Sequence, residues 1–465
     1  MNRRLSAVKF LTVAFFLAVV FFVQFSYADE PAISKPLTFK EFYKEVLAYY
    51  PKLKQQNINV NLAISRKLQA VSGFLPRVQG ITSVTSGNDP VYVFGSLLRE
   101  NSFTQDDFAL SRLNTPSPRT NFNISLTGQM PIFDAFQTIS RVRSAKLQID
   151  SARFEESFTK MEAFLLASEA YLRALSIEKL LAAVDEVNES SKEDIKQAED
   201  LKDKGLILGA DFYASKVMYG NILQLKNQLT QEKQAAHILM NILMGRYPFE
   251  PVEIQGVFTE NYRDSQQLQN WFEQAYKLRP DLAAVDKTIQ SQGIEVSREK
   301  STSLPRVDAF GQVTDDTHNF KSSGQNFIVG VKAQMDLFDP EYSSRVRISQ
   351  ETLKKLESDK VILKDNIIKD LTNEYAHYRA GQDNLPVIKD MLIDARQSVD
   401  LTLPLYREGR KSIADLLEIR TSFLNVARGY YALAADIKTS WTRMLFLSGQ
   451  LDEEHMDEVV SSIGE

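Results

Sequence analysis

The chain has 465 residues, of which 43% are hydrophobic and 25% are charged, and its formal net charge is −5. These proportions are typical of a folded protein and exclude a chain that is disordered throughout. The mild acidity, with no concentrated basic stripe, disfavours nucleic acid as a partner. Cysteine is absent, which excludes disulfides, thiol chemistry and metal sites with cysteine ligands.

Residues 1–28 are predicted to be a secretory signal peptide. Arg3 and Arg4 give a positively charged start, an apolar core follows from Phe10 to Val23, and Ser26-Tyr27-Ala28 forms a small-x-small cleavage site. A retained membrane anchor is the alternative, but the apolar run is short for a membrane span. No later segment is apolar enough for a transmembrane helix, so the mature chain is expected to be exported without one.

The first structural repeat is predicted to cover residues 37–250. After an initial helical stretch, residues 122–130 alternate between apolar and polar side chains, which is typical of a strand with two unlike faces. A polar loop rich in aromatic residues, 87–118, precedes that strand. The expected elements are strands at about 76–85 and 120–130, a long helix at 137–204, a tip at about 205–210 and a helix at 211–244.

The long helix is the dominant feature of this repeat. Residues 137–204 contain no Gly and no Pro and are rich in residues that lose little conformational freedom in a helix. A helix of this size would be about 100 Å long, far beyond the helices of a compact domain. Its apolar residues recur in steps of three and four, which favours packing against other helices.

The same order of elements recurs in the second half of the chain. Leu75-Pro76-Arg77-Val78 matches Leu304-Pro305-Arg306-Val307, and Gly205 matches Gly409. The offset is 229 residues at the first match and 204 at the second, because the intervening loop is 24 residues longer in the first repeat. After the loop the offset stays at 204 or 205 over about a hundred residues, which indicates a tandem duplication. The second repeat, residues 265–450, is therefore predicted to contain strands at about 305–314 and 326–337, a long helix at 343–408, a tip at about 409–412 and a helix at 413–448, followed by a polar C-terminal tail at 451–465.

The four predicted strands have the length needed to cross a membrane in a tilted barrel. An ordinary half-buried sheet packed on the helices is the alternative interpretation. Four strands cannot close on themselves, and their open edges could not lie in lipid. Two copies would give a filled eight-stranded barrel, whereas three would give twelve strands and a lumen. The strand count therefore favours a homo-oligomer.

These features together resemble the TolC-type outer-membrane efflux proteins over residues 37–450. The residues that carry the resemblance are the two Leu-Pro-Arg-Val turns, the second tip Gly409-x-x-Ser412-x-x-Asp415-Leu416-Leu417-x-x-Arg420, and the closing Leu447-Ser448-Gly449. The resemblance implies a mainly α fold in which a trimeric twelve-stranded outer-membrane β-barrel continues into a periplasmic α-helical barrel. It also implies outer-membrane lipid, a periplasmic adaptor (membrane fusion protein) and an inner-membrane pump as partners, in a Gram-negative bacterium.

The two tips are the first candidate sites. Gly205 and Gly409 each follow a long helix and suit the left-handed residue that ends one, which is also a purely structural role. The resemblance implies that such tips contact the adaptor. The adaptor-contact residues are predicted to be Lys204, Gly205, Leu206, Gly409 and Arg410.

Asp415 and Glu418 are the candidate periplasmic gate. Their three-residue spacing places both carboxylates on one helix face, and three copies would bring six carboxylates to the tunnel entrance. A structural alternative exists for Asp415, since Ser412-x-x-Asp415 is a variant capping box. The resemblance favours gating, because the entrance carboxylates of the family match these two positions.

Gly381, Pro386 and Pro404 interrupt the second long helix, whereas the first has no Gly or Pro at the matching places. Proline removes a backbone hydrogen bond and kinks a helix. The second hairpin is therefore predicted to contain a hinge that moves on opening, with a static kink as the alternative.

No enzyme chemistry is expected, because the four histidines share no ligand spacing and no nucleophile or phosphate-binding motif is present. The chain is predicted to be the passive exit duct of a tripartite efflux or type I secretion system, with no cofactor. A periplasmic coiled-coil adaptor or scaffold without a pore is the alternative.

Overall fold

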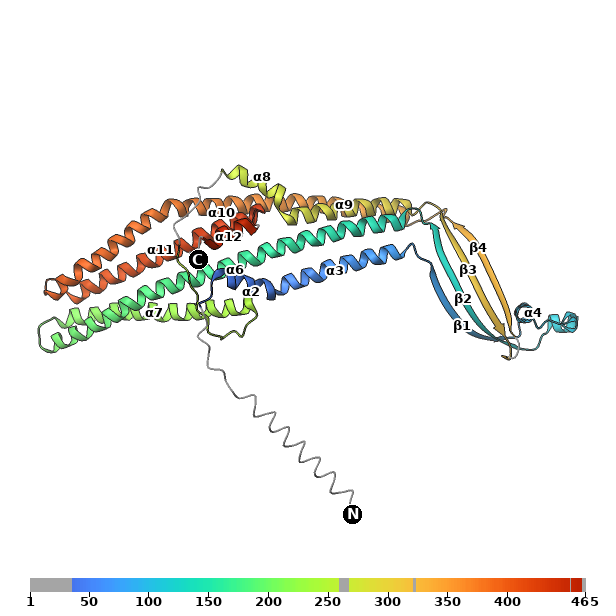
Figure 1. Cartoon of the computed structure of the whole chain (residues 1–465), viewed down its shortest axis with the longest axis horizontal. Coiled ribbons are helices and arrows are strands. Elements are labelled where there is room, and N and C mark those ends of the chain that lie inside the picture. Colours follow the sequence, from blue (N-terminus) through green and yellow to red (C-terminus); the bar gives the residue numbers. More distant parts are fainter. Residues whose placement is uncertain (1–35, 259–266, 321–322, 452, 462–465) are drawn as a thin grey trace, which may run out of the picture.

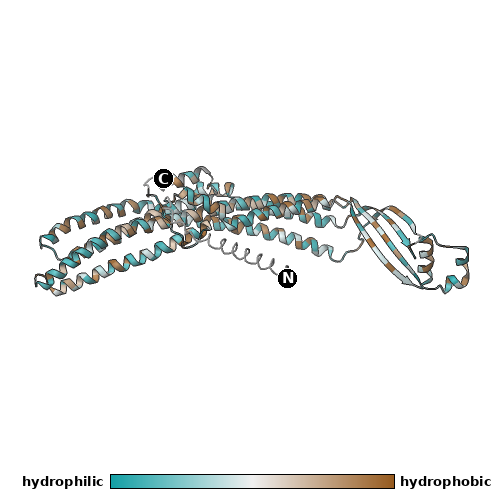
Figure 2. Cartoon of the chain, turned by 60° about the horizontal axis from the view of Figure 1, so that its bottom comes forward, coloured by the Kyte–Doolittle hydropathy of each residue, from teal (hydrophilic) through white to brown (hydrophobic). Residues whose placement is uncertain are grey.

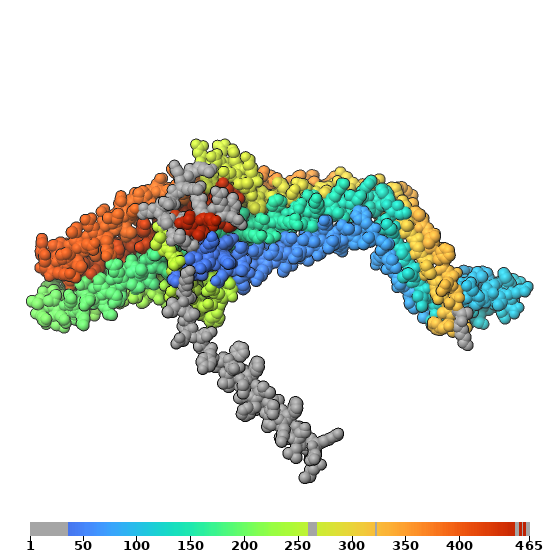
Figure 3. Space-filling view, viewed as in Figure 1, coloured from blue at the N-terminus to red at the C-terminus, as the bar shows by residue number. Residues whose placement is uncertain are grey.

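The computed structural model describes residues 36–258, 267–320, 323–451 and 453–461. The predicted signal peptide lies outside these residues. The chain is a long rod with a four-stranded sheet at one end, two helical hairpin tips at the other and short helices around the middle (Figure 1). Figure 3 shows that the sheet turns away from the helices and that segment 87–118 projects beyond it.

Eleven helices, one 3-10 helix and four strands occur in the described part of the chain. The helices are α2 (Phe39–Tyr49), α3 (Pro51–Ser72), α4 (Pro90–Arg99), α5 (Leu110–Asn114), α6 (Gln137–Asp203), α7 (Gly209–Met244), α8 (Leu268–Leu278), α9 (Pro280–Ser301), α10 (Tyr342–Arg407), α11 (Ile413–Ser448) and α12 (Glu453–Ser461), with the 3-10 helix η1 at Gln105–Phe108. The strands are β1 (Arg77–Gly87), β2 (Arg119–Phe133), β3 (Arg306–Thr317) and β4 (Gly324–Gln334).

The two longest helices, α6 and α10, have 67 and 66 residues and form the length of the rod. Each packs against two shorter helices, α3 and α7 along α6, and α9 and α11 along α10. The core seam of α6 consists of small and aromatic residues at helical spacing, including Phe164, Ala167 and Tyr171, which are fully buried. Burial of this seam, and not helix propensity alone, stabilises so long a helix.

A proline begins the helix next to the strands in both repeats. Pro51 starts α3 and Pro280 starts α9, and in each case a single residue separates the proline from the short helix before it. Proline suits the first position of a helix because the N–H that it lacks would have no partner there. The prolines therefore divide each segment into a short helix near the middle of the rod and a longer one that leads to the sheet.

The sheet is antiparallel throughout, with strand order β1-β2-β3-β4. Its central pair joins the two repeats, since β2 pairs with β3. Strand β2 continues past Pro131, where the sequence suggested that it would stop, and the register shifts between Pro131 and Phe133. A bulge of this kind accommodates the proline, which has no N–H for the ladder.

Two segments contain more structure than the sequence indicated. Segment 87–118, expected to be a loop, contains α4, η1 and α5. The polar tail expected at 451–465 contains α12, whose Val459 is buried against the core. The middle of the rod is further held by the hydroxyl of Tyr171, which lies between two carbonyl acceptors, those of Leu37 at 2.8 Å and Gln255 at 2.5 Å.

Candidate functional site

The register of the sheet separates two unlike faces. One face carries apolar side chains that are 55–78% exposed in the single chain; they are Val78, Val84, Ile124, Leu126, Val313, Phe327, Val329 and Val331. The other face carries polar side chains; they include Gln79, Ser83, Asn123, Thr127, Gln312, Thr314 and Asn326. Figure 2 shows the resulting alternation of colour along the strands. So large an exposed apolar face indicates a non-aqueous neighbour.

The sheet also has two unpaired edges. Within the described residues, strand β1 pairs only with β2, and strand β4 pairs only with β3. Because the four strands alternate in direction, β1 and β4 run antiparallel to each other. The β4 edge of one copy can therefore continue the antiparallel pattern with the β1 edge of a second copy.

At the opposite end of the rod, the two tips have the same backbone geometry. Gly205 has φ +70° and Gly409 has φ +72°, the left-handed conformation that closes a helix. The N–H of Leu206 donates to the carbonyl of Leu201 at 2.8 Å, and that of Arg410 donates to Leu405 at 2.9 Å. Gly205 and Gly409 have open space around them, so the backbone conformation and not packing requires glycine.

The candidate tip residues lie where a partner can reach them. Leu206 is 68% exposed at the end of the first hairpin. Lys204 follows the last residue of α6, and Arg410 forms an exposed ion pair with Glu408 at 3.4 Å. The two tips lie side by side at the end of the rod (Figure 1).

Asp415 is engaged in capping α11. Its carboxylate accepts from the N–H of Ser412 at 3.0 Å, while the Ser412 hydroxyl accepts from the N–H of Asp415 at 3.1 Å. The hydrogen bonds from Ser412 hold the pKa of the Asp415 carboxyl below its ordinary value, with a smaller effect from the charge of Lys411. Glu418 is exposed on the same helix, one turn further on. The carboxylate of Glu418 therefore remains available to solvent or a cation.

The three residues proposed as a hinge have different surroundings. Pro386 and Pro404 both lie within the uninterrupted α10. Gly381 is buried, and a Cβ built there would lie 2.6 Å from Cγ1 of Ile437 in α11. Glycine at 381 thus allows α10 and α11 to approach closely, which is a packing reason independent of any hinge.

A buried ion pair between the two hairpins was not identified from the sequence. Nη1 of Arg420 in α11 lies 2.7 Å from the Asp194 carboxylate in α6 and donates to the Ser191 hydroxyl at 3.0 Å. The Arg420 and Asp194 side chains are only 4% and 12% exposed. Burial raises the pKa of nearby Tyr406, with a smaller effect from the charge of Asp194. Arg420 belongs to the tip motif noted in the sequence, but its partner lies in the other repeat.

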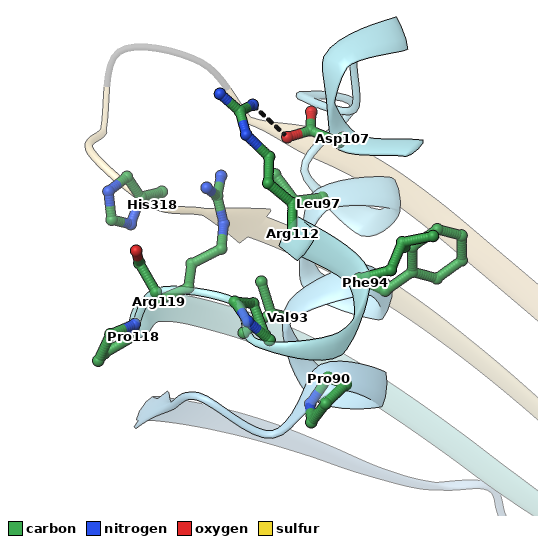
Figure 4. A pocket seen from close by; sticks show the side chains of 12 residues that line it. Pro90, Val93, Phe94, Leu97, Asp107, Arg112, Pro118, Arg119 and His318 are labelled. Carbon is green, nitrogen blue, oxygen red and sulfur yellow. Dashed lines mark hydrogen bonds and ion pairs between the residues drawn. The ribbon is translucent and has the colours of Figure 1, made fainter. Parts of the chain in front are cut away.

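At the far end of the sheet, segment 87–118 encloses a cavity of about 310 Å³. In Figure 4, α4 forms one wall, Arg112 pairs with Asp107 at 3.2 Å, and Arg119 and His318 lie opposite. Arg119 is itself paired with the buried Glu100, its Nε donating at 3.0 Å. The cations at this cavity are thus largely neutralised by partners within the chain.

Comparison with known proteins identifies the family. The model of the family described as "Outer membrane efflux protein" matches residues 271–450. The alkaline protease secretion protein AprF of Pseudomonas aeruginosa is 20% identical over 357 residues, which is 73% of this chain and 72% of that protein. The chain belongs to the TolC-type outer-membrane efflux protein family.

Solved structures share the fold of this efflux-family chain. The outer-membrane protein VceC of Vibrio cholerae matches with a TM-score of 0.72 and 13% identity, covering 88% of this chain and 96% of that one. The CmeC outer-membrane channel of Campylobacter jejuni matches with a TM-score of 0.70 and 14% identity, covering 94% of both chains. The expected mainly α fold with four antiparallel strands is confirmed.

The family is one of channels and not of enzymes, as the sequence predicted. Within the described residues, no group of three or more His, Cys, Asp or Glu is arranged to hold a metal ion. Among these same residues, no helix is both long and apolar enough to pass through a membrane.

Proposed function

We propose that three copies of this chain form an outer-membrane channel whose helices extend into the periplasm, and that it serves as the exit duct of a tripartite efflux or type I secretion system. The family places the chain in the outer membrane of a Gram-negative bacterium as an efflux channel. The number of copies and the identity of the partners are our inference. The observation that carries it is the sheet with one exposed apolar face, one polar face and two unpaired edges.

A trimer accounts for the unpaired edges, the apolar face and the polar face of the sheet. Pairing each β4 edge with a β1 edge closes twelve strands and leaves no unpaired backbone in lipid. The apolar face then contacts lipid and the polar face lines a water-filled lumen. The 67 residues of α6, at 1.5 Å each, extend about 100 Å from the sheet, enough to reach deep into the periplasm.

The tips are the proposed contact for a periplasmic adaptor, and the adaptor would connect the channel to an inner-membrane pump. The support is the repeated pair of exposed glycine turns at the end of the rod, with Leu206 uncovered. Asp415 and Glu418 would lie at the entrance formed by the second tip, where six carboxylates would favour cations. Motion at Pro386 and Pro404 would widen that entrance.

The alternative of a periplasmic scaffold without a pore leaves the apolar face of the sheet without an occupant. Fractionation separates the two possibilities. We expect the mature chain in the outer-membrane fraction as an oligomer that dissociates only on heating in detergent. A monomer that remains in the periplasmic fraction without detergent would overturn the channel.

The transported cargo is addressed by a second measurement. The curated relative is named as a protein secretion component, so a polypeptide is one candidate and a small toxic compound the other. Deleting the gene should remove a protein from the culture medium in the first case and raise sensitivity to toxic compounds in the second.

A further inference from the structure

Helix α4 lies on the polar face of the sheet at its outer end. Tyr92 packs 3.6 Å from the position of a Cβ at Gly87 of β1, and its hydroxyl donates to the carbonyl of Thr85 at 2.6 Å. At the other end of α4, Arg99 lies against Gly324 of β4 and its carbonyl accepts from Asn326 at 3.0 Å. Gly87, Gly324 and Asn326 all belong to the polar face by register.

The helix therefore crosses the whole width of the sheet. Its 10 residues give a length of about 15 Å. Three strand spacings, the distance from β1 to β4, amount to about 14 Å. Ion pairing between Glu100, which is 2% exposed, and Arg119 of β2 fixes the end of the crossing helix to the middle of the sheet. Gly324 is required at the contact, since any Cβ there would overlap the Arg99 carbonyl.

Helix α4 has three faces, and only two are covered. Tyr92, Ser96 and Arg99 face the sheet, and Ser96 is 1% exposed. Pro90, Val93, Phe94 and Leu97 line the cavity that α5 closes on the outer side. The third face consists of Val91, Gly95 and Leu98, one helical stripe in which Val91 is 80% and Leu98 is 49% exposed. This stripe, hereafter the α4 stripe, points into the space that the polar face bounds.

In the proposed trimer, that space is small. Twelve strands tilted by about 40° enclose a backbone diameter of about 24 Å. A helix of about 10 Å diameter that lies against the wall of this barrel reaches nearly to the axis, because the backbone radius is only about 12 Å. Three copies of α4 would thus fill the outer mouth, and each α4 stripe would meet the stripes of the other two copies.

We propose that the three α4 stripes pack together on the channel axis and close the outer mouth at rest. The inference rests on the proposed trimeric channel and adds a second closure, distant from the carboxylates of the periplasmic entrance. The occupant of the exposed stripe is the same stripe of the neighbouring copies. Opening the exit requires α4 to leave the axis, for which the contacts of Arg99 and Glu100 with the sheet must give way.

Cross-linking tests the contact between stripes directly. The chain has no cysteine, so Leu98→Cys introduces the only thiol. Mild oxidation of outer membranes should join Leu98→Cys copies into disulfide-linked dimers. Val84→Cys is the matched control, because it lies at the same end of the sheet on the lipid face and its copies are held apart by the barrel wall. Absence of dimers with Leu98→Cys in a correctly assembled trimer would overturn the proposal.

Labelling of intact cells tests the closure. Ser83→Cys places a thiol on the polar face below α4, and a membrane-impermeant dye-maleimide is added outside. We expect slow labelling, accelerated roughly tenfold when Val91→Asp and Leu98→Asp place repelling charges on the axis. Labelling of Ser83→Cys that is already fast without these two changes would overturn the closure.

Leu110→Cys in α5, where the native side chain is 76% exposed, separates failure of the closure from failure of the channel. This thiol lies in the outer segment and should be labelled rapidly with or without the aspartates. If it is labelled and Ser83→Cys is equally fast, the channel stands and the closure is wrong. If Leu110→Cys is never labelled on intact cells, the proposed channel is wrong and the closure falls with it.

Discussion

The carboxylate of Asp415 caps α11 and also carries a negative charge at the proposed entrance. Mutation can separate these two roles. The carboxylate accepts the Ser412 N–H at 3.0 Å and so begins α11. Because its folded pKa lies below the ordinary value, its contribution to stability is present above about pH 4 and is lost as the pH falls through the lowered pKa. Glu418 has no such capping position in α11.

We predict that Asp415→Asn and Glu418→Gln each raise single-channel conductance or weaken block by cations, since both remove charge while retaining an acceptor. Asp415→Ala should in addition speed amide exchange in the first turn of α11, because the cap itself is lost. If Asp415→Asn and Glu418→Gln leave conductance and cation block unchanged, the carboxylates do not gate the entrance.

Arg420 allows a sharper test of stability. Removing it leaves the Asp194 carboxylate buried without its partner, which costs about 3 kcal/mol or more. Arg420→Ala is therefore expected to lower the temperature at which the oligomer dissociates in detergent. Arg410→Ala is the control, because its side chain is 70% exposed and its ion pair contributes little. Equal dissociation temperatures for the two variants would contradict this prediction.

Sequence reasoning at the residue scale succeeded where the requirement is local. A glycine directly after a long helix predicts a left-handed turn, and Gly205 and Gly409 have that conformation. The contact between Arg420 and α6 could not be predicted, because Ser191 and Arg420 are 229 residues apart and meet only when the two hairpins pack. The roles of the tip and gate residues remain predictions.

At the scale of the elements, the packing of α10 against α11 depends on the close approach of the two helices at Gly381. Gly381→Ala would place a methyl group 2.6 Å from Ile437, which is 2% exposed and cannot move away freely. We predict destabilisation by about 1–3 kcal/mol, measured by thermal unfolding of the solubilised protein. Removing the clashing Cγ1 in Gly381→Ala/Ile437→Ala should make the double variant less destabilised than the sum of the two single changes.

Gly293→Ala in α9 is the matched control for that pair, since a Cβ there meets nothing within 4 Å. Alanine is the better helix former, so this variant should be neutral or more stable by up to about 1 kcal/mol. Destabilisation by Gly293→Ala as large as that by Gly381→Ala would show that close packing at Ile437 is not the cause.

The long helices were predictable because uninterrupted propensity and a repeated apolar seam agree over many turns. The helices of segment 87–118 were missed because its Gly, Pro and Asn residues favour turns. A local signal was nevertheless present: Asp89 accepts the N–H of Tyr92 at 2.8 Å and Pro90 follows it, an N-cap and first-turn proline. No local signal predicts that α4 lies across the sheet, because this position depends on contacts with β1, β2 and β4.

For the molecule as a whole, the same substitution is expected to have opposite effects at neighbouring positions on the two faces of the sheet. Val313→Lys places a charge on the proposed lipid face, which costs about 2–4 kcal/mol per copy near the membrane centre. Gln312→Lys places the same charge on the lumen face, where water solvates it. We expect Val313→Lys to reduce the heat-modifiable oligomer in outer membranes strongly and Gln312→Lys to leave its amount nearly unchanged. Equal loss with both would contradict the assignment of faces.

The unpaired margins of β1 and β4 also govern how such a channel can be made. In a lone copy, two rows of backbone donors and acceptors have no partner and cannot enter lipid. Insertion and association must therefore occur as one event, and the yield of mature channel should rise more steeply than linearly with the supply of newly exported chains. Surplus copies awaiting partners would expose adhesive strand edges, so the bacterium has a physical reason to match synthesis of this protein to its assembly capacity.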